Sequence, residues 1–333
     1  MKGTTIVEKQ IVQTHQKKKA AAGSGAKQKI LAFASLIVLI VVFSLSSSNF
    51  FVFDNLVGIM LSTAVIGVLA LGSTFVIITG GIDLSVGTVM TFSSVMAGVI
   101  INFWHVSLPL GVIGGILAGA LCGLTSGLMV AKMKIPPFIA TLAMMMITKG
   151  LSLVISGTKP IYFNDYPNFA KISMGKLIPG IPNAILIFLG LGVIASIILT
   201  KTLIGRYTFA LGSNEEATRL SGVNTVRWKI VIYTMTGVFS GIAGILMASR
   251  LNSAQPALGS GYELDAIAAV VIGGTSLSGG AGSILGTVIG ALIMSVLTNG
   301  LRILSVAPEW QTVIVGFVII LAVYADILRR RKR

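Results

Sequence analysis

The sequence predicts an all-α polytopic membrane protein, a compact, glycine-rich bundle of about ten transmembrane helices. Hydrophobic residues make up 54% of the 333 residues and charged residues 11%, and the mean hydropathy is +0.94. Such a composition is typical of a chain embedded in a bilayer. Apolar stretches of roughly 17 to 25 residues, the length that crosses a bilayer as a helix, recur along the chain. The charged residues gather in the two tails and in a few connections.

Ten apolar segments can be laid out in chain order, and each is expected to cross the membrane once. The first is interpreted as a retained helix, because its polar lead-in and its apolar run are both long for a signal peptide. Eight crossings are the alternative, since the region 264–300 is rich in glycine and need not cross twice. The ten segments lie near residues 30–46, 56–79, 86–104, 108–131, 137–156, 183–200, 229–248, 264–279, 283–300 and 311–328.

The net charge of +15 follows the pattern of membrane topology, and no nucleic-acid partner is expected. Basic residues fill both tails, 1–29 and 329–333, which are therefore predicted to lie in the cytoplasm on either side of a transmembrane domain, 30–328. The basic connection 201–229 then falls on the same side. One cysteine, Cys122, and two histidines are too few for a disulfide framework or a metal site, so no metal is expected.

Glycine spacing predicts close contact between helices. Glycines recur at every fourth residue from Gly111 to Gly127, and again from Gly282 to Gly290. Small residues at this interval let helix backbones approach closely in lipid, where packing drives association. Packing within one bundle explains these stripes better than a dimer seam does, so they carry no information on function.

An internal echo marks two breaks in the helical pattern. The segments 80–87 (GGIDLSVG) and 273–280 (GGTSLSGG) share the pattern GGxxLSxG, and each lies between two apolar stretches. A chance match is the alternative, since Gly and Ser are common in this chain. A true repeat is typical of transporters whose glycine-broken helices present backbone groups near the transport pathway. The polar side chains of the echo are the candidates for lining such a pathway: Asp83, Ser85, Ser276 and Ser278.

Asp83, the one acid of the echo, has two interpretations. A carboxylate withdrawn from water is costly unless it is paired or hydrogen-bonded, which favours a contact that changes during transport. Alternatively, Asp83 caps the span that follows by accepting backbone N–H bonds. The layout of spans places Asp83 at the cytoplasmic end of the bundle, whereas a broken helix would place it toward the midplane.

The stretch 206–222 (RYTFALGSNEEATRLSG) places a charged helix between two apolar spans. Ser213 and Glu216 are predicted to form an S-x-x-E capping box, and Gly222 is predicted to end the helix. So short a helix is not stable alone, and it is expected to dock against a partner.

The chain lacks the motifs of a catalyst or of an energy source. No stretch fits GxxxxGK[ST] or HExxH, and no serine has the histidine partner that a nucleophilic triad needs. Lys149 is interpreted as a snorkelling side chain, and an intramembrane carboxylate pair cannot be assembled. A transporter without its own coupling site depends on a partner for energy. Four charged residues approach the apolar zone, each near a predicted span end: Asp83, Lys149, Glu263 and Asp265.

Three stretches, 74–90, 210–224 and 253–293, resemble the permease subunits of bacterial ABC sugar importers. The ribose-type branch is the most similar, and its relatives carry galactose, xylose, allose, arabinose and autoinducer-2. The resemblance extends over about residues 50–326. It implies a permease for a monosaccharide in the bacterial inner membrane, not an enzyme, with no cofactor in this chain.

The resemblance also implies partners. These are a second copy of the chain or a paralogue, an extracytoplasmic sugar-binding protein, and an ABC ATPase with two fused nucleotide-binding domains that holds ATP and Mg. The chain keeps the spacing of the EAxxxxG motif by which importer permeases dock a cytoplasmic coupling helix on the ATPase, with Thr218 where a second Ala is common. The residues implied in coupling are Glu215, Glu216, Ala217, Arg219 and Gly222.

Polar groups suited to sugar hydroxyls lie on the predicted outer side: Asn252, Gln255, Tyr262, Glu263 and Asp265. The alternative is a solvated connection or a docking surface for the binding protein. Two other functions stay open beside monosaccharide import. The same machinery could carry autoinducer-2 or branched-chain amino acids, or the chain could be an autonomous secondary carrier driven by an ion gradient.

Overall fold

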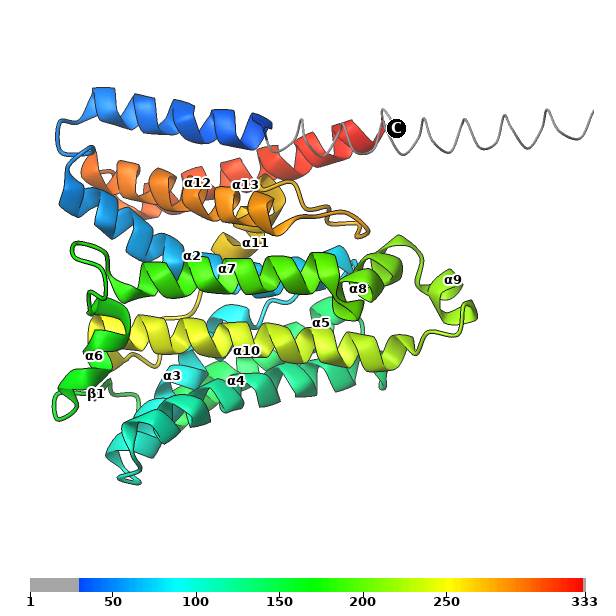
Figure 1. Ribbon diagram of the computed structural model, residues 1–333, viewed down its shortest axis with the longest axis horizontal. Helices are drawn as coiled ribbons and strands as arrows, with labels where there is room; N and C mark the ends of the chain where they lie inside the picture. Colours follow the sequence, from blue (N-terminus) through cyan, green and yellow to red (C-terminus); the bar gives the residue numbers. More distant parts are fainter. Residues whose placement is uncertain (1–29, 332–333) are drawn as a thin grey trace, which may run out of the picture.

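The computed structural model describes residues 30–331 and shows a bundle of helices with a single short pair of strands in that range (Figure 1). The predicted tail 1–29 and residues 332–333 lie outside the described residues. The strands β1 (Ile161–Tyr162) and β2 (Ser253–Ala254) are antiparallel, with Ile161 opposite Ala254. The helices are Ile30–Ser46, α2 (Phe53–Ile78), α3 (Val86–Asn102), α4 (Leu108–Ala131), α5 (Pro137–Ser156), α6 (Pro167–Met174), α7 (Asn183–Lys201), α8 (Leu203–Ser213), α9 (Glu215–Leu220), α10 (Thr225–Leu251), α11 (Tyr262–Ile272), α12 (Ile284–Ile303) and α13 (Pro308–Arg331).

The chain is an all-α, multi-pass membrane protein. Among the described residues, six helices are long and apolar enough to cross a membrane, namely α2, α4, α5, α7, α10 and α12. Three further apolar helices are shorter, at Ile30–Ser46, Val86–Asn102 and Pro308–Tyr324. These nine coincide with nine of the predicted segments. The count of ten crossings stays a prediction.

The predicted span 264–279 is not a continuous helix, and this part of the sequence-based layout is wrong. α11 has 11 residues, which corresponds to about 16 Å, roughly half of the apolar thickness of a bilayer. The helix ends at Ile272 with Gly273 as its C-cap, and Gly274 then takes a φ of +93°, a left-handed conformation that glycine adopts without strain. The glycine-rich character noted at 264–300 therefore reflects a broken segment.

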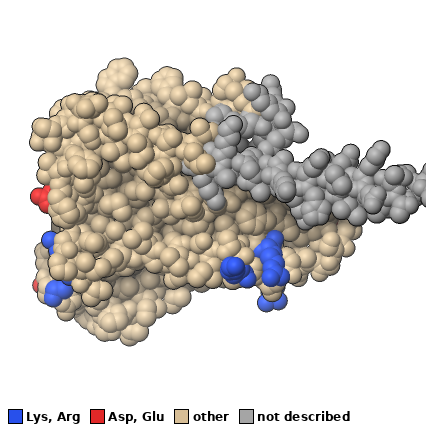
Figure 2. All heavy atoms as spheres, turned by 45° about the horizontal axis from the view of Figure 1, so that its top comes forward, with Lys and Arg blue, Asp and Glu red and all other residues tan. Residues whose placement is uncertain are grey.

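α2 is the central helix of the bundle. Its apolar window is 94% buried, whereas the corresponding windows of α4, α5 and α7 are 28% buried. A helix that is apolar on all sides is expected to be surrounded by other helices, and α2 packs against α7, α10, α11 and α12. The outer helices leave large apolar side chains exposed, as expected for surfaces that face lipid. Figure 2 shows one broad uncharged face of this kind, with charged side chains only in small groups.

The glycine stripe of α4 packs against α10. A Cβ added to Gly119 would lie 2.6 Å from the backbone oxygen of Gly237, and one added to Gly127 would lie 2.9 Å from the Cα of Ile230. Both distances are shorter than real Cβ contacts, so a larger residue at either position would push the helices apart. The prediction that this stripe packs within the bundle is confirmed.

The elements that carry the predicted cytoplasmic segments share one end of the molecule. Figure 1 shows the start of the first described helix, α8, α9 and the end of α13 at one end, and β1 and α6 at the opposite end. We call these the α9 end and the β1 end. This arrangement agrees with an even number of crossings along the chain, as the charge pattern predicts.

Candidate functional site

The two GGxxLSxG segments touch each other at the α9 end of the bundle. The Gly280 N–H donates a hydrogen bond to the Ile78 oxygen at 2.8 Å, and a Cβ on Gly279 would lie 2.9 Å from the Gly80 nitrogen. α2 ends at Ile78 and α11 ends at Ile272, so in both copies the helix stops at the glycine pair and a new helix follows. Equivalent breaks in direct contact favour a true repeat over a chance match.

The last turn of α8 lies against this junction. A Cβ added to Gly212 would lie 2.6 Å from the Gly280 nitrogen and would overlap the Ile78 oxygen. The backbones of α2, of α8 and of the second glycine segment therefore meet without any side chain between them. α9 begins two residues after Ser213, so little chain separates it from this junction.

α9 is a separate helix, but its cap differs from the predicted one. Asn214, not Ser213, is the N-cap, and its Oδ1 accepts a hydrogen bond from the Ala217 N–H at 2.9 Å. The predicted capping box is wrong because α8 continues through Ser213, and asparagine is an equally good capping residue. The predicted stop is confirmed, since Gly222 follows the helix with a φ of +83°.

The charged side chains of α9 form two ion pairs. Glu216 accepts from Arg219 at 2.6 Å, and Glu215 accepts from Lys229 of α10 at 2.7 Å. The hydrogen bond from Arg219 to Glu216 raises the pKa of the Arg219 guanidinium. Ala217 is exposed, and Leu220 is 77% exposed beside these charges.

Asp83 is buried, with 4% of its surface exposed. Its Oδ1 accepts hydrogen bonds from the Ser85 N–H at 2.8 Å and from the Ser85 hydroxyl at 2.6 Å. The adjacent backbone is held by Thr141 of α5, whose hydroxyl donates to the Ile82 oxygen and accepts from the Leu84 N–H, both at 3.2 Å. Asp83 thus bonds to Ser85, which is the N-cap residue of α3, and no side chain caps the first turn of that helix; the capping role of Asp83 stays a prediction. A role in the pathway stays a prediction.

The serines of the second copy lie differently. Ser276 is buried, and its hydroxyl has no hydrogen-bond partner among the described residues. Ser278 is exposed. The structure therefore keeps Asp83 and Ser85 together as a bonded pair, and it does not gather the four echo residues into one site.

The N-terminus of α3 lies deep in the bundle, where it meets the N-terminus of α11. Thr88, in the first turn of α3, receives a 2.8 Å hydrogen bond from Thr148, which lies well inside α5. A Cβ on Gly87 would lie 2.5 Å from the Glu263 carboxylate. Two helices that begin at this depth aim their unsatisfied N–H groups and their positive dipole ends toward the same region.

The five predicted outer residues are separated by the fold. Asn252 donates to Asn164 at 3.1 Å beside the strand pair, and Gln255 donates to Ser253 at 2.9 Å. Glu263 is only 8% exposed, and its carboxylate accepts from the Gly261 N–H at 3.0 Å. Glu263 is therefore not part of a solvated connection, which was one of the alternatives for these five residues. Tyr262 and Asp265 alone of the five reach a sizeable cavity.

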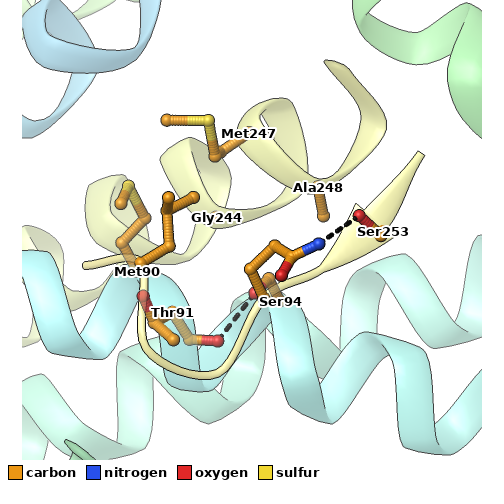
Figure 3. A pocket seen from close by; sticks show the side chains of 9 residues that line it. Met90, Thr91, Ser94, Gly244, Met247, Ala248 and Ser253 are labelled. Carbon is orange, nitrogen blue, oxygen red and sulfur yellow. Dashed lines mark hydrogen bonds between the residues drawn. The ribbon is translucent and has the colours of Figure 1, made fainter. Parts of the chain in front are cut away.

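A narrow hollow beside Gln255 lies between α3 and α10 (Figure 3). Its volume is about 10 Å³, which is no more than a single water needs. Met90, Thr91 and Ser94 of α3 line one side, and Met247 and other α10 residues line the other. This hollow is a packing seam and is too small for a sugar.

The large cavity, which we call the arginine cavity, has a volume of about 480 Å³. Small-molecule sites typically measure roughly 300–1,000 Å³. The cavity lies among α2, α10, α11, α12 and α13, and its charged side chains are Arg250, Asp265 and Arg302. The polar lining residues are Ser62, Arg250, Ser260, Tyr262, Asp265, Thr298, Arg302, Gln311 and Thr312.

Comparison with known proteins assigns the chain to a family. The family model described as the branched-chain amino acid transport system permease component matches residues 55–323, which is most of the chain. The chain belongs to this family of transport permeases. The resemblance that the sequence motifs indicate is thereby confirmed at the level of the family.

Curated relatives align with the permease over most of its length. The ribose import permease protein RbsC of Escherichia coli K12 is 43% identical over 295 residues, which cover 88% of this chain and 91% of that protein. RbsC of Bacillus subtilis 168 is 43% identical over 317 residues, with 95% and 97% covered. The L-arabinose transport system permease protein AraH of E. coli K12 is 38% identical over 324 residues, with 94% and 98% covered.

Sequence reasoning about the permease missed Arg250, Arg302 and Gln311. Both arginines lie near the ends of apolar segments, where basic residues are usually explained by the membrane interface. A signal was nevertheless present. In the predicted layout Arg250 and Arg302 fall on the outer side, where basic residues are scarce, and this departure from the charge rule marks them.

Lys149 lies well inside α5, about two turns from the end of that helix, rather than near a span end as predicted. It lines a shallow recess together with Thr88, Gly259 and Ser260, next to the start of α11. Ser260 also lines the arginine cavity. The permease thus places a lysine on one flank of the 255–261 loop and two arginines on the other.

Proposed function

We propose that this permease is the membrane-spanning subunit of an ABC importer that translocates a ribose-like monosaccharide across the bacterial inner membrane. The observation that carries the proposal is the 43% identity to ribose import permeases over 88% to 95% of the chain. The glycine-broken helices and a polar cavity of about 480 Å³ are compatible with a small polar solute.

The energy is supplied by a separate ATPase with two fused nucleotide-binding domains, which binds ATP and Mg. α9 is the coupling helix, since it projects from the end of the bundle that carries the described ends of the chain, and it exposes Ala217 and Leu220. Both termini and α9 then lie in the cytoplasm, as the basic tails favour. An extracytoplasmic sugar-binding protein docks at the β1 end, and a second copy or a paralogue completes the transporter.

The chain's own part in the cycle is mechanical. Closure of the ATPase on ATP displaces α9, and α8 carries the displacement to Gly212, which touches the ends of both broken helices. The second break continues into α11, whose first turn lines the arginine cavity with Tyr262 and Asp265. Movement at one end of the bundle is thereby linked to opening and closing of a cavity that extends toward the other.

A branched-chain amino acid is the second candidate cargo. It is favoured by the description of the family model and by the charges of the cavity, because Asp265 and the two arginines could hold an ammonium and a carboxylate. The two cargoes are distinguished by uptake of labelled ribose and labelled leucine into the same vesicles.

The test uses proteoliposomes that contain the permease, the ATPase and the sugar-binding protein. We expect labelled ribose to accumulate only when ATP and the binding protein are both present, with no uptake of leucine. Uptake that needs neither partner and follows a proton or sodium gradient would identify a secondary carrier instead. Uptake of leucine without ribose would favour the second candidate.

A further inference from the structure

The arginine cavity connects the β1 end of the bundle with its interior. Arg250 and Arg302 lie near the C-terminal ends of α10 and α12, and Pro308 begins α13 at the same level. The first turn of α11, with Tyr262 and Asp265, forms the opposite wall. That turn lies deep in the bundle, because its Glu263 packs against Gly87 at the start of α3.

The two arginines in this cavity have unused hydrogen-bonding capacity. Among the described residues neither Arg250 nor Arg302 lies within 4.0 Å of a carboxylate oxygen. Arg250 makes only a long contact of 3.4 Å with the Ser62 hydroxyl. A guanidinium carries five N–H donors in a planar fork, and two such groups lining one cavity repel each other unless acceptors lie between them. Arg302 is exposed and Arg250 is half-buried, so water reaches both guanidinium groups, and a ligand rich in oxygen acceptors would replace that water between them.

The remaining polar groups favour a neutral polyol over an anion. Asp265 lines the same cavity, and its carboxylate would repel a phosphate or a carboxylate but accept hydrogen bonds from hydroxyl groups. Tyr262 and Gln311 can both donate and accept. A sugar hydroxyl is itself both donor and acceptor, so a monosaccharide satisfies the arginines through its oxygens and Asp265 through its hydrogens.

We propose that the arginine cavity is a holding site for the sugar on its way through the permease, and that Arg250 and Arg302 bind its hydroxyl oxygens. This inference rests on the proposed function and specifies the residues that hold the substrate. Asp265 accepts from the sugar hydroxyls on the opposite wall. The sugar enters from the β1 end. The helix α11 lies between the sugar and the second GGxxLSxG segment, 273–280, which follows the C-terminal end of α11.

The deciding measurement is the number of sugar molecules imported per ATP hydrolysed. R250Q and R302Q are reconstituted with the ATPase and the binding protein, beside wild type and K159Q. Lys159 serves as the matched control, because it is an exposed basic residue in the connection between α5 and β1 and does not line the cavity. We expect each arginine variant to lose about tenfold or more in ribose uptake, the usual effect of deleting a charged hydrogen-bond partner. ATPase activity stimulated by loaded binding protein should change little.

Two other outcomes would overturn the inference. Unchanged sugar-to-ATP ratios in both variants would show that the cavity does not hold the sugar. A parallel fall of uptake and of stimulated ATPase would assign the arginines to docking of the binding protein. R250K should recover part of the uptake, since lysine keeps the charge but not the planar fork.

A second measurement does not depend on folding of the arginine variants. A single cysteine at Thr298, one turn from Arg302 on α12, is placed in a Cys122→Ala background. A small water-soluble thiol reagent should modify it, and Asn168→Cys on α6 is the exposed positive control. A Thr298 cysteine that stays unmodified while the Asn168 cysteine reacts would show that the cavity is closed to water and therefore to a hydrated sugar. Failure of wild type to import ribose would contradict the proposed function, whereas wild-type import with unaltered variants contradicts only the role of the cavity.

Discussion

The two glycine-broken segments share one sequence pattern but differ in how firmly they are held. At the first break, Asp83 bonds twice to Ser85, and Thr141 of α5 bonds to the backbone on both sides of Asp83. At the second break, the buried hydroxyls of Thr275 and Ser276 have no partner among the described residues. Three glycines there, Gly274, Gly279 and Gly280, have positive φ angles, whereas the first break has one, Gly80.

This difference indicates which break moves. A segment whose polar groups are satisfied resists displacement, because each buried bond that is lost leaves an uncompensated group. A segment with unpartnered hydroxyls and left-handed glycines has less to lose and can gain bonds in another conformation. We therefore expect the first break to act as a fixed support and the second to move when α8 is displaced.

The largest effect is expected from Gly212→Ala, which separates the two breaks from α8. The new methyl group would overlap the Ile78 oxygen and lie 2.6 Å from the Gly280 nitrogen. Overpacking of this kind typically costs about 1–3 kcal/mol, and here it also disturbs the contact that transmits movement. We expect ribose uptake to be abolished and the thermal midpoint of the detergent-purified protein to fall.

Gly150→Ala is the matched control for this prediction. Gly150 lies in α5 with no atom within 4 Å of an added Cβ. Alanine in a helix interior is about 0.5–1 kcal/mol more favourable than glycine, so uptake should persist and the thermal midpoint should stay or rise. Equal behaviour of the two variants would contradict the importance of the junction at Gly212.

A large effect on transport without loss of stability is expected from Glu216→Lys. The change replaces the ion pair with Arg219 by a repulsion and places a positive charge at the N-terminus of α9, where the helix dipole disfavours it. Membrane insertion should be normal, while co-purification of the ATPase and sugar-stimulated hydrolysis should both fall. Wild-type values for both would count decisively against α9 as the coupling helix.

Helix positions were predictable because a bilayer requires long apolar segments with all backbone groups bonded internally. The break after Ile272 was indicated by the glycine pair of the second echo segment, but the layout of apolar segments ran on to residue 279 because the uncharged residues that follow the helix do not mark its end. The one-residue error at the α9 cap has a similar origin. Ser213 and Asn214 are both good caps, and Asn214 takes the role because α8 continues through Ser213.

One part of the candidate site was predictable from the sequence and the other was not. The coupling segment was predictable since its charges, its motif and its stop at Gly222 are contiguous in the sequence. The arginine cavity was not, because five helices contribute to it and Arg250 and Arg302 share no motif. Tyr262 and Asp265 were identified by their chemistry, but their separation from Glu263, one and two residues away, depends on which face of α11 each occupies.

A moderate effect is expected from Asp83→Ala at the first break. The substitution removes the acceptor of two buried hydrogen bonds from Ser85, and loss of a buried partner costs about 1–3 kcal/mol. Asp83→Asn keeps an acceptor oxygen at the same place, so it should retain most of the thermal stability and of the ribose uptake. Severe loss of uptake in a correctly inserted Asp83→Asn transporter would instead show that the charge itself takes part in translocation.

The smallest effect is expected at the equivalent position of the second break. Ser276→Ala removes a buried hydroxyl that has no partner among the described residues, and deletion of an unsatisfied polar group is neutral or slightly stabilising. We expect an unchanged or slightly higher thermal midpoint, with any loss confined to the rate of uptake, because a hydroxyl that bonds only in the other conformation would stabilise that state. A fall in thermal midpoint as large as that of Asp83→Ala would show that both breaks are equally anchored, and the assignment of movement to the second would be wrong.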